Sequence, residues 1–375
     1  MSPRPIVLAA GGTGGHMFPA EALAAELLQR GFPVALVTDR RGQAFGERLP
    51  GVALHRIRAG RIGAGLMGKV TALAETALGT LEAGRLLRAL APAAAVGFGG
   101  YPSVPTMLAA TRLGLPTLLH EQNALLGRAN RLLAPRVGTI ATSFANVGGL
   151  RAGAAARIVE TGNPVRGAVA ALRGAPYVAP GDGRIEILVI GGSQGARILS
   201  ATVPEALARL DPDLRARLFV MQQARPEDLA EVERAHAAHG IAAEVAPFFE
   251  DVPARLARAH LVISRSGAST VAELATIGRP AILVPYRFAA DDHQSANARA
   301  LAEVGAAWVM PEASFTPPRL AEQIALLLAA PQSLAAAATA AHRLGRPDAA
   351  ERLADLVAAA AGHNGAAARA TEHAA

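Results

Sequence analysis

Two stretches of the sequence decide the fold: residues 5–16 read PIVLAAGGTGGH, and residues 185–196 read IEILVIGGSQGA. Each begins with a short apolar run, which is typical of a buried strand, and passes directly into a glycine-rich loop. Each is followed by a segment with helical apolar periodicity, residues 19–30 in the first case and the stretch through Leu210 in the second. The sequence therefore predicts the same strand, loop and helix unit twice.

The later part of each half is repeated as well. In each half a strand with its loop is followed by a helix, a glycine–proline turn and another strand. In the first half the strand and loop span residues 95–101, the turn spans 114–116 and the second strand spans 117–120. In the second half the corresponding ranges are 261–267, 278–280 and 281–285. In each turn the glycine is expected to end the helix in a left-handed conformation, and the proline prevents its continuation. Short apolar strands alternating with helices predict α/β domains with parallel sheets, whose ligands bind beyond the carboxyl ends of the strands.

The chain is long enough for two such domains. It has 375 residues, of which 51% are apolar, and a domain typically takes about 150 residues. We place the boundary at the turn of residues 162–164, which predicts an N-terminal Rossmann-like domain over 1–162 and a C-terminal one over 163–362. The last helix is a candidate to pack back on the first domain, and residues 363–375 are expected to form a mobile tail.

Composition narrows the function classes. The chain has no cysteine, which excludes disulfides, a thiolate nucleophile and Cys-ligated zinc. The first residues read as a strand and not as a signal peptide. The uncharged stretch over residues 89–111 is broken by prolines and glycines, so we interpret it as a buried strand, loop and helix and not as a membrane span. The net charge of +7 favours anionic partners such as nucleotides, phospholipid headgroups or nucleic acid.

The glycine loops favour phosphate binding. Glycines without side chains let backbone N–H groups close on phosphate oxygens at a helix N-terminus, although tight turns without a ligand remain the alternative for one loop alone. No glycine run ends in the Gly-Lys-Ser or Gly-Lys-Thr of a P-loop, and Lys69 is the only lysine. Neither loop has the dinucleotide fingerprint, and Asp39 is a weak candidate for a ribose contact, so a nicotinamide enzyme is disfavoured.

A serine hydrolase is a second interpretation. Residues 191–195 satisfy G-x-S-x-G in a strand–turn–helix context, which would make Ser193 a nucleophile with Asp291, Asp292 and His293 downstream. That interpretation leaves the loops at residues 11–16 and 264–270 unexplained. It also places the acid and the histidine side by side in one segment.

Several polar residues are candidates on their own. His16, which follows the first glycine loop, could act as a base, contact a leaving group or only cap its helix. His236 and His239 share a helix face without a carboxylate pattern for a metal, so we expect them to be exposed to solvent. The Asp-Pro-Asp of residues 211–213 predicts a turn or helix start, not a metal–diphosphate site. Amides and hydroxyls of residues 264–270 suit a diphosphate, and Glu273 could accept hydrogen bonds from ribose hydroxyls or be an ordinary surface glutamate.

Six motifs taken together closely resemble the bacterial MurG family, over residues 6 to about 353. They are residues 11–16 (GGTGGH), 99–101 (GGY), 120–123 (HEQN), 162–166 (GNPVR), 191–196 (GGSQGA) and 265–268 (RSGA). The resemblance implies the GT-B fold, with two Rossmann-like domains whose parallel sheets face a central cleft. It also implies transfer of N-acetylglucosamine (GlcNAc) from UDP-GlcNAc to the C4 hydroxyl of the muramyl sugar of lipid I, with inversion, which forms lipid II for peptidoglycan.

The resemblance also implies site residues. The donor site is expected to contain Thr13, Gly14, Gly15, Asn123, Arg166, Ser193, Phe249, Ser266, Gly267, Ala268, Ser269, Thr270, Glu273 and Gln294, with Phe249 recognising uracil through its backbone. The acceptor side is expected to contain Gly99, Gly100 and Tyr101. His16 is the expected base or leaving-group contact, and Glu121 is the rival base. Amides and hydroxyls near residues 266–270, with Arg166, would stabilise charge on the departing UDP. No metal or cofactor is expected.

The lipid-linked acceptor implies a peripheral enzyme on the cytoplasmic face of the inner membrane. Residues 55–62, with Leu66, Met67 and Lys69, mix basic and apolar side chains and suit an anionic phospholipid surface, or else contact the acceptor diphosphate. Other cell-wall enzymes are candidate partners, and nucleic acid is not. The alternatives to a transferase are an enzyme like UDP-GlcNAc 2-epimerase, a nucleotide-binding protein without activity, and the serine hydrolase.

Overall fold

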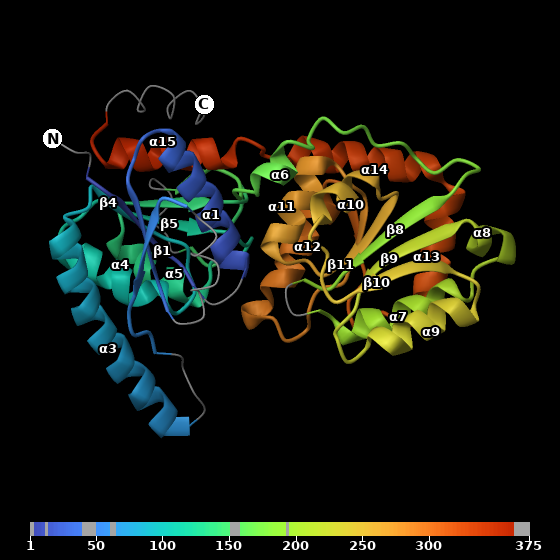
Figure 1. Ribbon diagram of the computed structural model, residues 1–375, viewed down its shortest axis with the longest axis horizontal. Coiled ribbons are helices and arrows are strands. Elements are labelled where there is room, and N and C mark those ends of the chain that lie inside the picture. Colours follow the sequence, from blue (N-terminus) through green and yellow to red (C-terminus); the bar gives the residue numbers. More distant parts are fainter. Residues whose placement is uncertain are drawn as a thin grey trace. The chain divides into compact units, whose positions relative to one another are not determined.

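The structure is a computed structural model that describes residues 4–11, 14–39, 50–60, 65–150, 158–192 and 195–363. The chain divides into two compact units (Figure 1): unit 1 comprises Met1–Arg166 and Arg346–Ala375, and unit 2 comprises Gly167–Gly345. Four sets of predictions concern residues wholly or partly outside the described ranges: the donor contact of Thr13, both roles of Ser193, the tail beyond residue 363, and residues 61–62 of the basic and apolar segment.

Unit 1 is built on a parallel sheet. Among the described residues its seven strands are β1 (Ile6–Ala9), β2 (Val34–Thr38), β3 (Val52–Arg56), β4 (Ala94–Gly97), β5 (Thr117–Glu121), β6 (Thr139–Thr142) and β7 (Ile158–Glu160). Their order across the sheet is β3-β2-β1-β4-β5-β6-β7, and every pair is parallel. The uncharged stretch over 89–111 forms the end of a helix, β4 and most of another helix, which confirms the strand, loop and helix interpretation.

Helices cover both faces of this sheet because successive side chains of a strand point to opposite sides. On one face, Ile6 and Leu8 pack with α1 (Gly14–Gln29) and α15 (Ala349–Ala360). On the other, Val7 and Ala9 pack with α3 (Gly65–Leu90), α4 (Ser103–Arg112) and α5 (Arg128–Leu133), which is followed by the short η1 (Ala134–Arg136). The C-terminal helix α15 thus lies beside α1 (Figure 1), and an ion pair of 2.5 Å between Arg30 and Asp355 joins them.

Unit 2 repeats the architecture with a six-stranded parallel sheet in its described residues. Its strands are β8 (Ile185–Ile190), β9 (Leu218–Gln223), β10 (Ala242–Ala246), β11 (Leu261–Ser264), β12 (Ala281–Leu283) and β13 (Ala307–Val309), in the order β10-β9-β8-β11-β12-β13. Its helices are α6 (Gly167–Ala170), α7 (Arg197–Leu207), α8 (Pro212–Ala216), α9 (Leu229–Ala238), α10 (Val252–Arg258), α11 (Ala268–Ile277), η3 (Ala290–Asp292), α12 (His293–Glu303), α13 (Pro317–Ala329) and α14 (Pro331–Leu344).

Each sheet reverses its strand order at its middle. In unit 1 the chain moves outward from β1 through β2 and β3, and then returns to the other side of β1 with β4. In unit 2, β8 and β11 stand in the same relation. Ligands of open α/β sheets bind outside the carboxyl ends of the strands at this switch point. The glycine motifs after β1, β4, β8 and β11 all lie at these two points.

The predicted turn chemistry is largely confirmed. Gly114 and Gly278 follow their helices with φ of +67° and +73°, as the glycine–proline turns predict. Asp211 caps α8, since its side chain accepts a hydrogen bond from the N–H of Asp213, and Pro212 is the first helical residue. The prediction of a solvent-exposed His236 is wrong: its side chain is 1% exposed, and its Nε2 lies 2.9 Å from Oε1 of Gln222 on β9. The helix periodicity did not reveal that this face packs on the sheet.

No single helix among the described residues is both long and apolar enough to cross a membrane, although the bent pair at 317–329 and 331–360 passes the same test of length and composition. Leu320 and Ile324 of that pair are buried in the core of unit 2.

Candidate functional site

Two glycines shape the loop after β4. Gly99 and Gly100 have φ of +82° and +72°, a backbone conformation that side chains disfavour. A Cβ at residue 100 would lie 3.2 Å from the carbonyl oxygen of Gly11 and 3.4 Å from Nε2 of His16. The loops after β1 and β4 therefore touch, and the His16 ring lies against the glycine that follows β4.

The His16 side chain begins a chain of buried polar groups. Its Nδ1 lies 3.1 Å from Oε1 of Gln122, and Nε2 of Gln122 lies 3.0 Å from Nδ1 of His120. Nε2 of His120 in turn lies 3.0 Å from the carbonyl oxygen of Gly162. Burial lowers the pKa of His120 to about 4, so this imidazole is neutral at pH 7. Three segments that are distant in the sequence are thus joined at the carboxyl end of β5.

The Glu121 carboxylate is fully committed to its own loop. Its Oε1 accepts hydrogen bonds from the backbone and side-chain N–H groups of Asn123, at 3.0 and 3.1 Å. Its Oε2 accepts from the N–H of Gly127 at 2.9 Å and from Nδ2 of Asn130 at 2.8 Å. Glu121 is only 1% exposed. Because four donors already occupy its oxygens, this geometry favours His16 over Glu121 as the base.

Other predicted residues of unit 1 lie around these loops. Gly14 and Gly15 form the first turn of α1, and a Cβ at Gly14 would lie 2.9 Å from the ring of Phe18. The hydroxyl of Tyr101 donates to Asp39 Oδ2 at 2.5 Å, so Asp39 orients the Tyr101 side chain. The guanidinium of Arg166 lies 5.2 Å from the centre of the Phe18 ring.

In unit 2 the loop after β8 accepts nothing larger than glycine at its start. A Cβ on Gly191 would lie 2.4 Å from the backbone nitrogen of Ala196, and Gly192 and Gly195 have positive φ. Gln223 accepts from the N–H of Gly191 at 3.1 Å and donates to the carbonyl oxygen of Pro247 at 3.2 Å. Gln223 therefore holds the loops after β8 and β10 together.

The loop after β11 leads into the N-terminus of α11. Ser266 is fully buried and donates to the carbonyl oxygen of Gln294 at 2.8 Å, and Asn297 donates to the Ser266 carbonyl at 3.1 Å. Gly267 precedes the helix in an extended conformation, so Ala268, Ser269 and Thr270 form its first turn. The first N–H groups of a helix lack partners within the helix and favour an anion.

Two further side chains of α11, those of Ser269 and Glu273, carry buried polar groups. The Ser269 hydroxyl is buried without a hydrogen-bond partner among the described residues. Glu273, one turn further on, is 8% exposed and is therefore not an ordinary surface glutamate. Gln294 accepts from the N–H of Tyr286 at 2.9 Å, which fixes its side-chain amide.

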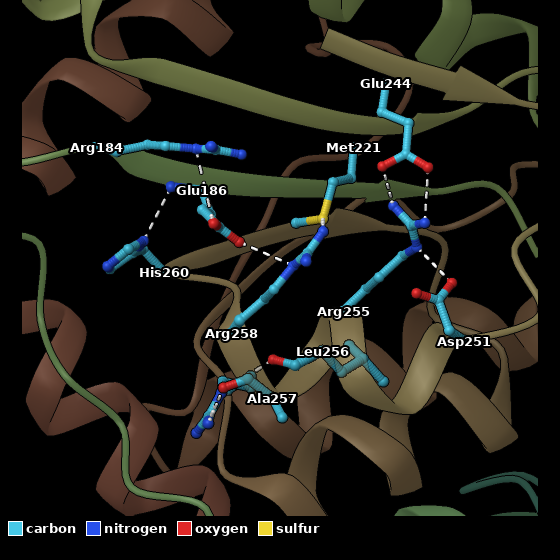
Figure 2. Close-up of polar contacts among 11 residues, drawn as sticks. Arg184, Glu186, Met221, Glu244, Asp251, Arg255, Leu256, Ala257, Arg258 and His260 are labelled. Carbon is cyan, nitrogen blue, oxygen red and sulfur yellow. Dashed lines mark hydrogen bonds and ion pairs between the residues drawn. The ribbon is translucent and has the colours of Figure 1, made fainter. Parts of the chain in front are cut away.

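Arg255 forms a clamp, by which we mean its contacts with Phe249, Glu244 and Asp251, that the sequence did not reveal. The guanidinium of Arg255 lies 3.9 Å from the centre of the Phe249 ring. It also binds both oxygens of Glu244, at 2.6 and 2.7 Å, and Asp251 at 2.6 Å (Figure 2). The hydrogen bonds from Arg255 lower the pKa of both carboxyl groups. Arg255 thus fastens the segment between β10 and α10 that carries Phe249.

The residues of the hydrolase interpretation give it no support where they are described. Nδ1 of His293 lies 2.8 Å from the carbonyl oxygen of Ala290, and Asp292 accepts a hydrogen bond from Ser295 at 2.7 Å. These contacts lie at the start of α12 and use groups that a triad would need. Among the described residues, no cluster of three or more His, Asp or Glu side chains is arranged to hold a metal ion.

Comparison with known families identifies the class of this two-domain protein as a glycosyltransferase. The sequence matches the glycosyltransferase family 28 N-terminal domain over residues 6–142 and the glycosyltransferase family 28 C-terminal domain over residues 186–353. The chain is 58% identical, over 96% of both chains, to the UDP-N-acetylglucosamine--N-acetylmuramyl-(pentapeptide) pyrophosphoryl-undecaprenol N-acetylglucosamine transferase of Rhodospirillum centenum. The transferase of the same name from Rhodospirillum rubrum is 56% identical, over 96% of this chain and 93% of that protein.

Solved structures agree with this assignment. The crystal structure of Acinetobacter baumannii MurG is similar with a TM-score of 0.78 and 31% identity, over 95% of this chain and 99% of that one. A UDP-GlcNAc 2-epimerase from Neisseria meningitidis, bound to UDP-GlcNAc, has a TM-score of 0.64 at 14% identity, over 93% of this chain and 98% of that one, and shares only the fold. The chain belongs to the MurG family, and its fold is the GT-B fold with two Rossmann-like, parallel-sheet domains.

Proposed function

We propose that this chain transfers GlcNAc from UDP-GlcNAc to the muramyl sugar of undecaprenyl-pyrophosphoryl-MurNAc-pentapeptide (lipid I) and so forms lipid II for peptidoglycan. The observation that carries the proposal is the 58% identity to a transferase of that name across 96% of both chains. Five of the six motifs that carry the resemblance fall inside the two matched family models, and the sixth, residues 162–166, lies between them. The acceptor hydroxyl is the one at C4, and the anomeric centre is inverted.

The proposed reaction is one displacement. The oxygen of the acceptor hydroxyl forms a bond to C1 of GlcNAc, and the C1–oxygen bond to the diphosphate breaks with its electron pair passing to UDP. The acceptor proton passes to Nε2 of His16, a position consistent with the ring lying against Gly100. No covalent sugar–enzyme intermediate is required.

Donor recognition is proposed to fall mainly on unit 2. The glycine loop after β8 and the first turn of α11 offer backbone N–H groups at a strand-order switch point, where a diphosphate is favoured. Ser269 supports this assignment, since its buried hydroxyl has an unused hydrogen-bonding capacity. Glu273 is proposed to bind ribose hydroxyls, and the backbone at Phe249 to bind uracil. Thr13 and Ser193 are proposed donor contacts outside the described residues.

The test is release of UDP from UDP-GlcNAc by the purified protein, with and without a soluble lipid I analogue. Release only with the acceptor, together with a disaccharide product, is the expected result. Acceptor-independent conversion to the 2-epimer would establish the epimerase instead. Binding of UDP-GlcNAc without any conversion would identify a nucleotide-binding protein, and labelling of Ser193 by a fluorophosphonate would identify the hydrolase.

The lipid-linked acceptor requires association with a membrane, and we place the contact on α3. Five of its apolar side chains are exposed, at 85, 60, 72, 43 and 61% of their surface: Met67, Val70, Leu73, Leu78 and Leu81. They follow helical spacing along one side, and Lys69, Arg85 and Arg88 are exposed on the same helix. This surface extends the basic and apolar segment identified in the sequence, of which residues 61–64 and the side chain of Leu66 lie outside the described structure.

This membrane contact is tested by sedimentation with vesicles. The double change Leu73→Ser and Leu81→Ser is expected to weaken binding to vesicles of phosphatidylglycerol and phosphatidylethanolamine, because it removes apolar surface that would enter the interface. Leu326→Ser, at a leucine of unit 2 that is 60% exposed, is the matched control. Equal binding by both variants would remove α3 from the contact. The cytoplasmic leaflet and interactions with other cell-wall enzymes remain predictions.

A further inference from the structure

The buried chain of polar groups behind His16 has one consistent arrangement of hydrogens. Its far end is the carbonyl oxygen of Gly162, which can only accept a hydrogen bond. The nitrogen that faces it, Nε2 of His120, must therefore carry the hydrogen. Since burial holds His120 neutral, with a pKa of about 4, its Nδ1 is left bare and can only accept.

The next group, Gln122, is oriented by two acceptors. Its Nε2 lies 3.0 Å from the bare Nδ1 of His120 and 3.0 Å from the His120 carbonyl oxygen, so the NH₂ group has a use for both hydrogens. If the Gln122 amide were reversed, its oxygen would face the His120 carbonyl oxygen, and neither group could donate. Nδ1 of His120 would then have to carry the hydrogen, and Nε2 of His120 would face the Gly162 carbonyl oxygen without one. The amide oxygen of Gln122 therefore faces His16, at 3.1 Å from Nδ1.

We infer that Gln122 and His120 are positioning residues that hold the hydrogen of neutral His16 on Nδ1 and thereby leave the lone pair on Nε2, the atom beside Gly100. An oxygen can only accept, so Nδ1 of His16 must donate to Gln122. The relay runs from a backbone carbonyl through two side chains to the proposed base. Gln122 is 1% exposed and His120 is fully buried, so water does not compete with the bond between these two residues or with that from His120 to Gly162.

The surroundings of Nε2 fit this assignment. A Cβ at residue 100 would lie 3.2 Å from Cδ2 and 3.4 Å from Nε2 of His16, so any side chain there would cover the ring edge that bears the lone pair. Glycine at this position, with φ of +72°, keeps that edge open to an incoming hydroxyl. The inference rests on the proposed function only in naming the hydroxyl whose proton is taken.

The direct test is the tautomeric state of His16 in the free wild-type protein. Selective ¹⁵N labelling of histidine distinguishes a nitrogen with hydrogen from a bare one, and loss of one ring system in His16→Gln assigns the signals. The expected result for the neutral ring is a hydrogen on Nδ1 and a bare Nε2. A hydrogen on Nε2 would overturn the inference, whether or not the protein proves to be a transferase and whether or not any variant folds.

The kinetic test removes the relay with Gln122→Met, which keeps approximate volume. Losing the acceptor on Nδ1 lets the hydrogen move to Nε2, so kcat is expected to fall about tenfold or more, with KM for UDP-GlcNAc changed less than about twofold. The ¹⁵N spectrum should show the tautomer shift in parallel. A kcat within about twofold of wild type would contradict a positioning role.

The chain offers a matched control in unit 2. Gln222 and His236 form a second buried pair, with Oε1 of Gln222 at 2.9 Å from Nε2 of His236, outside the proposed chemistry. Gln222→Met is expected to lower stability to a similar extent and to leave the His16 tautomer and kcat unchanged. If wild-type protein shows no acceptor-dependent release of UDP, the proposed function fails. The wild-type ¹⁵N spectrum still shows whether the relay holds the hydrogen of His16 on Nδ1.

Discussion

The loop clusters of units 1 and 2 occupy equivalent places in equivalent sheets, yet they are built from different groups. In unit 1 the loop after β5 is tied to the first turn of α1 and to Gly162 through His16, Gln122 and His120, and Glu121 orders that loop from within. In unit 2 the loops after β8 and β11 are shaped mainly by glycines, backbone carbonyls and small side chains such as Ser266.

The difference matches two chemical needs. Transfer of a proton requires an imidazole held in one orientation and one tautomer, which a hydrogen bond to its other ring nitrogen provides. Binding of a diphosphate requires backbone N–H groups that can approach closely, which side chains would prevent. We therefore propose that one architecture, repeated in the chain, serves proton transfer in one unit and anion binding in the other.

The largest expected effect comes from removing the imidazole of unit 1. His16→Gln should lower kcat about 10²- to 10³-fold, because the acceptor hydroxyl loses its base. Steady-state kinetics with a soluble lipid I analogue measure this change. A loss of less than about tenfold would place the base elsewhere and would weaken the contrast between the units.

The corresponding change in unit 2 is Gly191→Ala. Its Cβ would lie 2.4 Å from the backbone nitrogen of Ala196, so the loop must move, and such overpacking typically costs about 1–3 kcal/mol. KM for UDP-GlcNAc should rise about tenfold or more. Gly183→Ala is the control, since nothing lies within 4 Å of a Cβ there. Equal kinetics for the two variants would argue against a tightly fitted phosphate loop.

The two buried histidines allow a comparison by pH. Burial lowers the pKa of both His120 and His236 to about 4, whereas an unfolded histidine has a pKa of about 6.5. As the pH falls below 6.5, these histidines bind protons in the unfolded chain but not in the folded chain. The free energy of unfolding therefore decreases between about pH 6.5 and pH 4.

His236→Gln should remove one of these penalties. Between pH 7 and pH 5 the variant should lose about 2 kcal/mol less unfolding free energy than the wild type, as measured by urea titration at both pH values. If the two proteins lose the same amount, His236 is already protonated in the folded state.

The smallest expected effect concerns Arg255. Arg255→Gln removes the clamp on Glu244 and Asp251 and the contact with the Phe249 ring, so KM for UDP-GlcNAc should rise about threefold to tenfold through misplacement of that segment. Arg209→Gln, which breaks an exposed pair with Glu205 on α7, is the control and should change nothing measurable. Unchanged KM in both variants would mean that the Phe249 segment positions itself without the clamp.

Local patterns predicted much of the fold. The apolar run over residues 185–190 is the strand Ile185–Ile190, and the glycine–proline turns end their helices as expected, because these features depend on neighbouring residues. The glycine motifs also located the loops at both switch points. Two helices depend on more distant features. The sequence analysis did not predict α3 as a helix, although Met67 and Lys69 in its first turns were expected at a phospholipid surface. It named the last helix only as a candidate to pack on the first domain, and α15 lies beside α1 across more than 300 residues of sequence.

The side-chain network could not be predicted, because it depends on which strands become neighbours. Gln122 stood inside a recognised motif without a role, and only the approach of α1 and Gly162 to the end of β5 reveals one. The bond between Arg255 and Glu244 spans 11 residues and follows no helical spacing, and the burial of His236 depends on packing against β9.

The central claim is that unit 1 supplies the base while unit 2 binds the diphosphate. The most direct measurement is the Kd of UDP for His16→Gln and Gly191→Ala by calorimetry. The expected Kd is within about twofold of wild type for His16→Gln and is raised about tenfold or more for Gly191→Ala. A Kd raised tenfold in His16→Gln would make His16 a contact of the leaving group and would contradict the division.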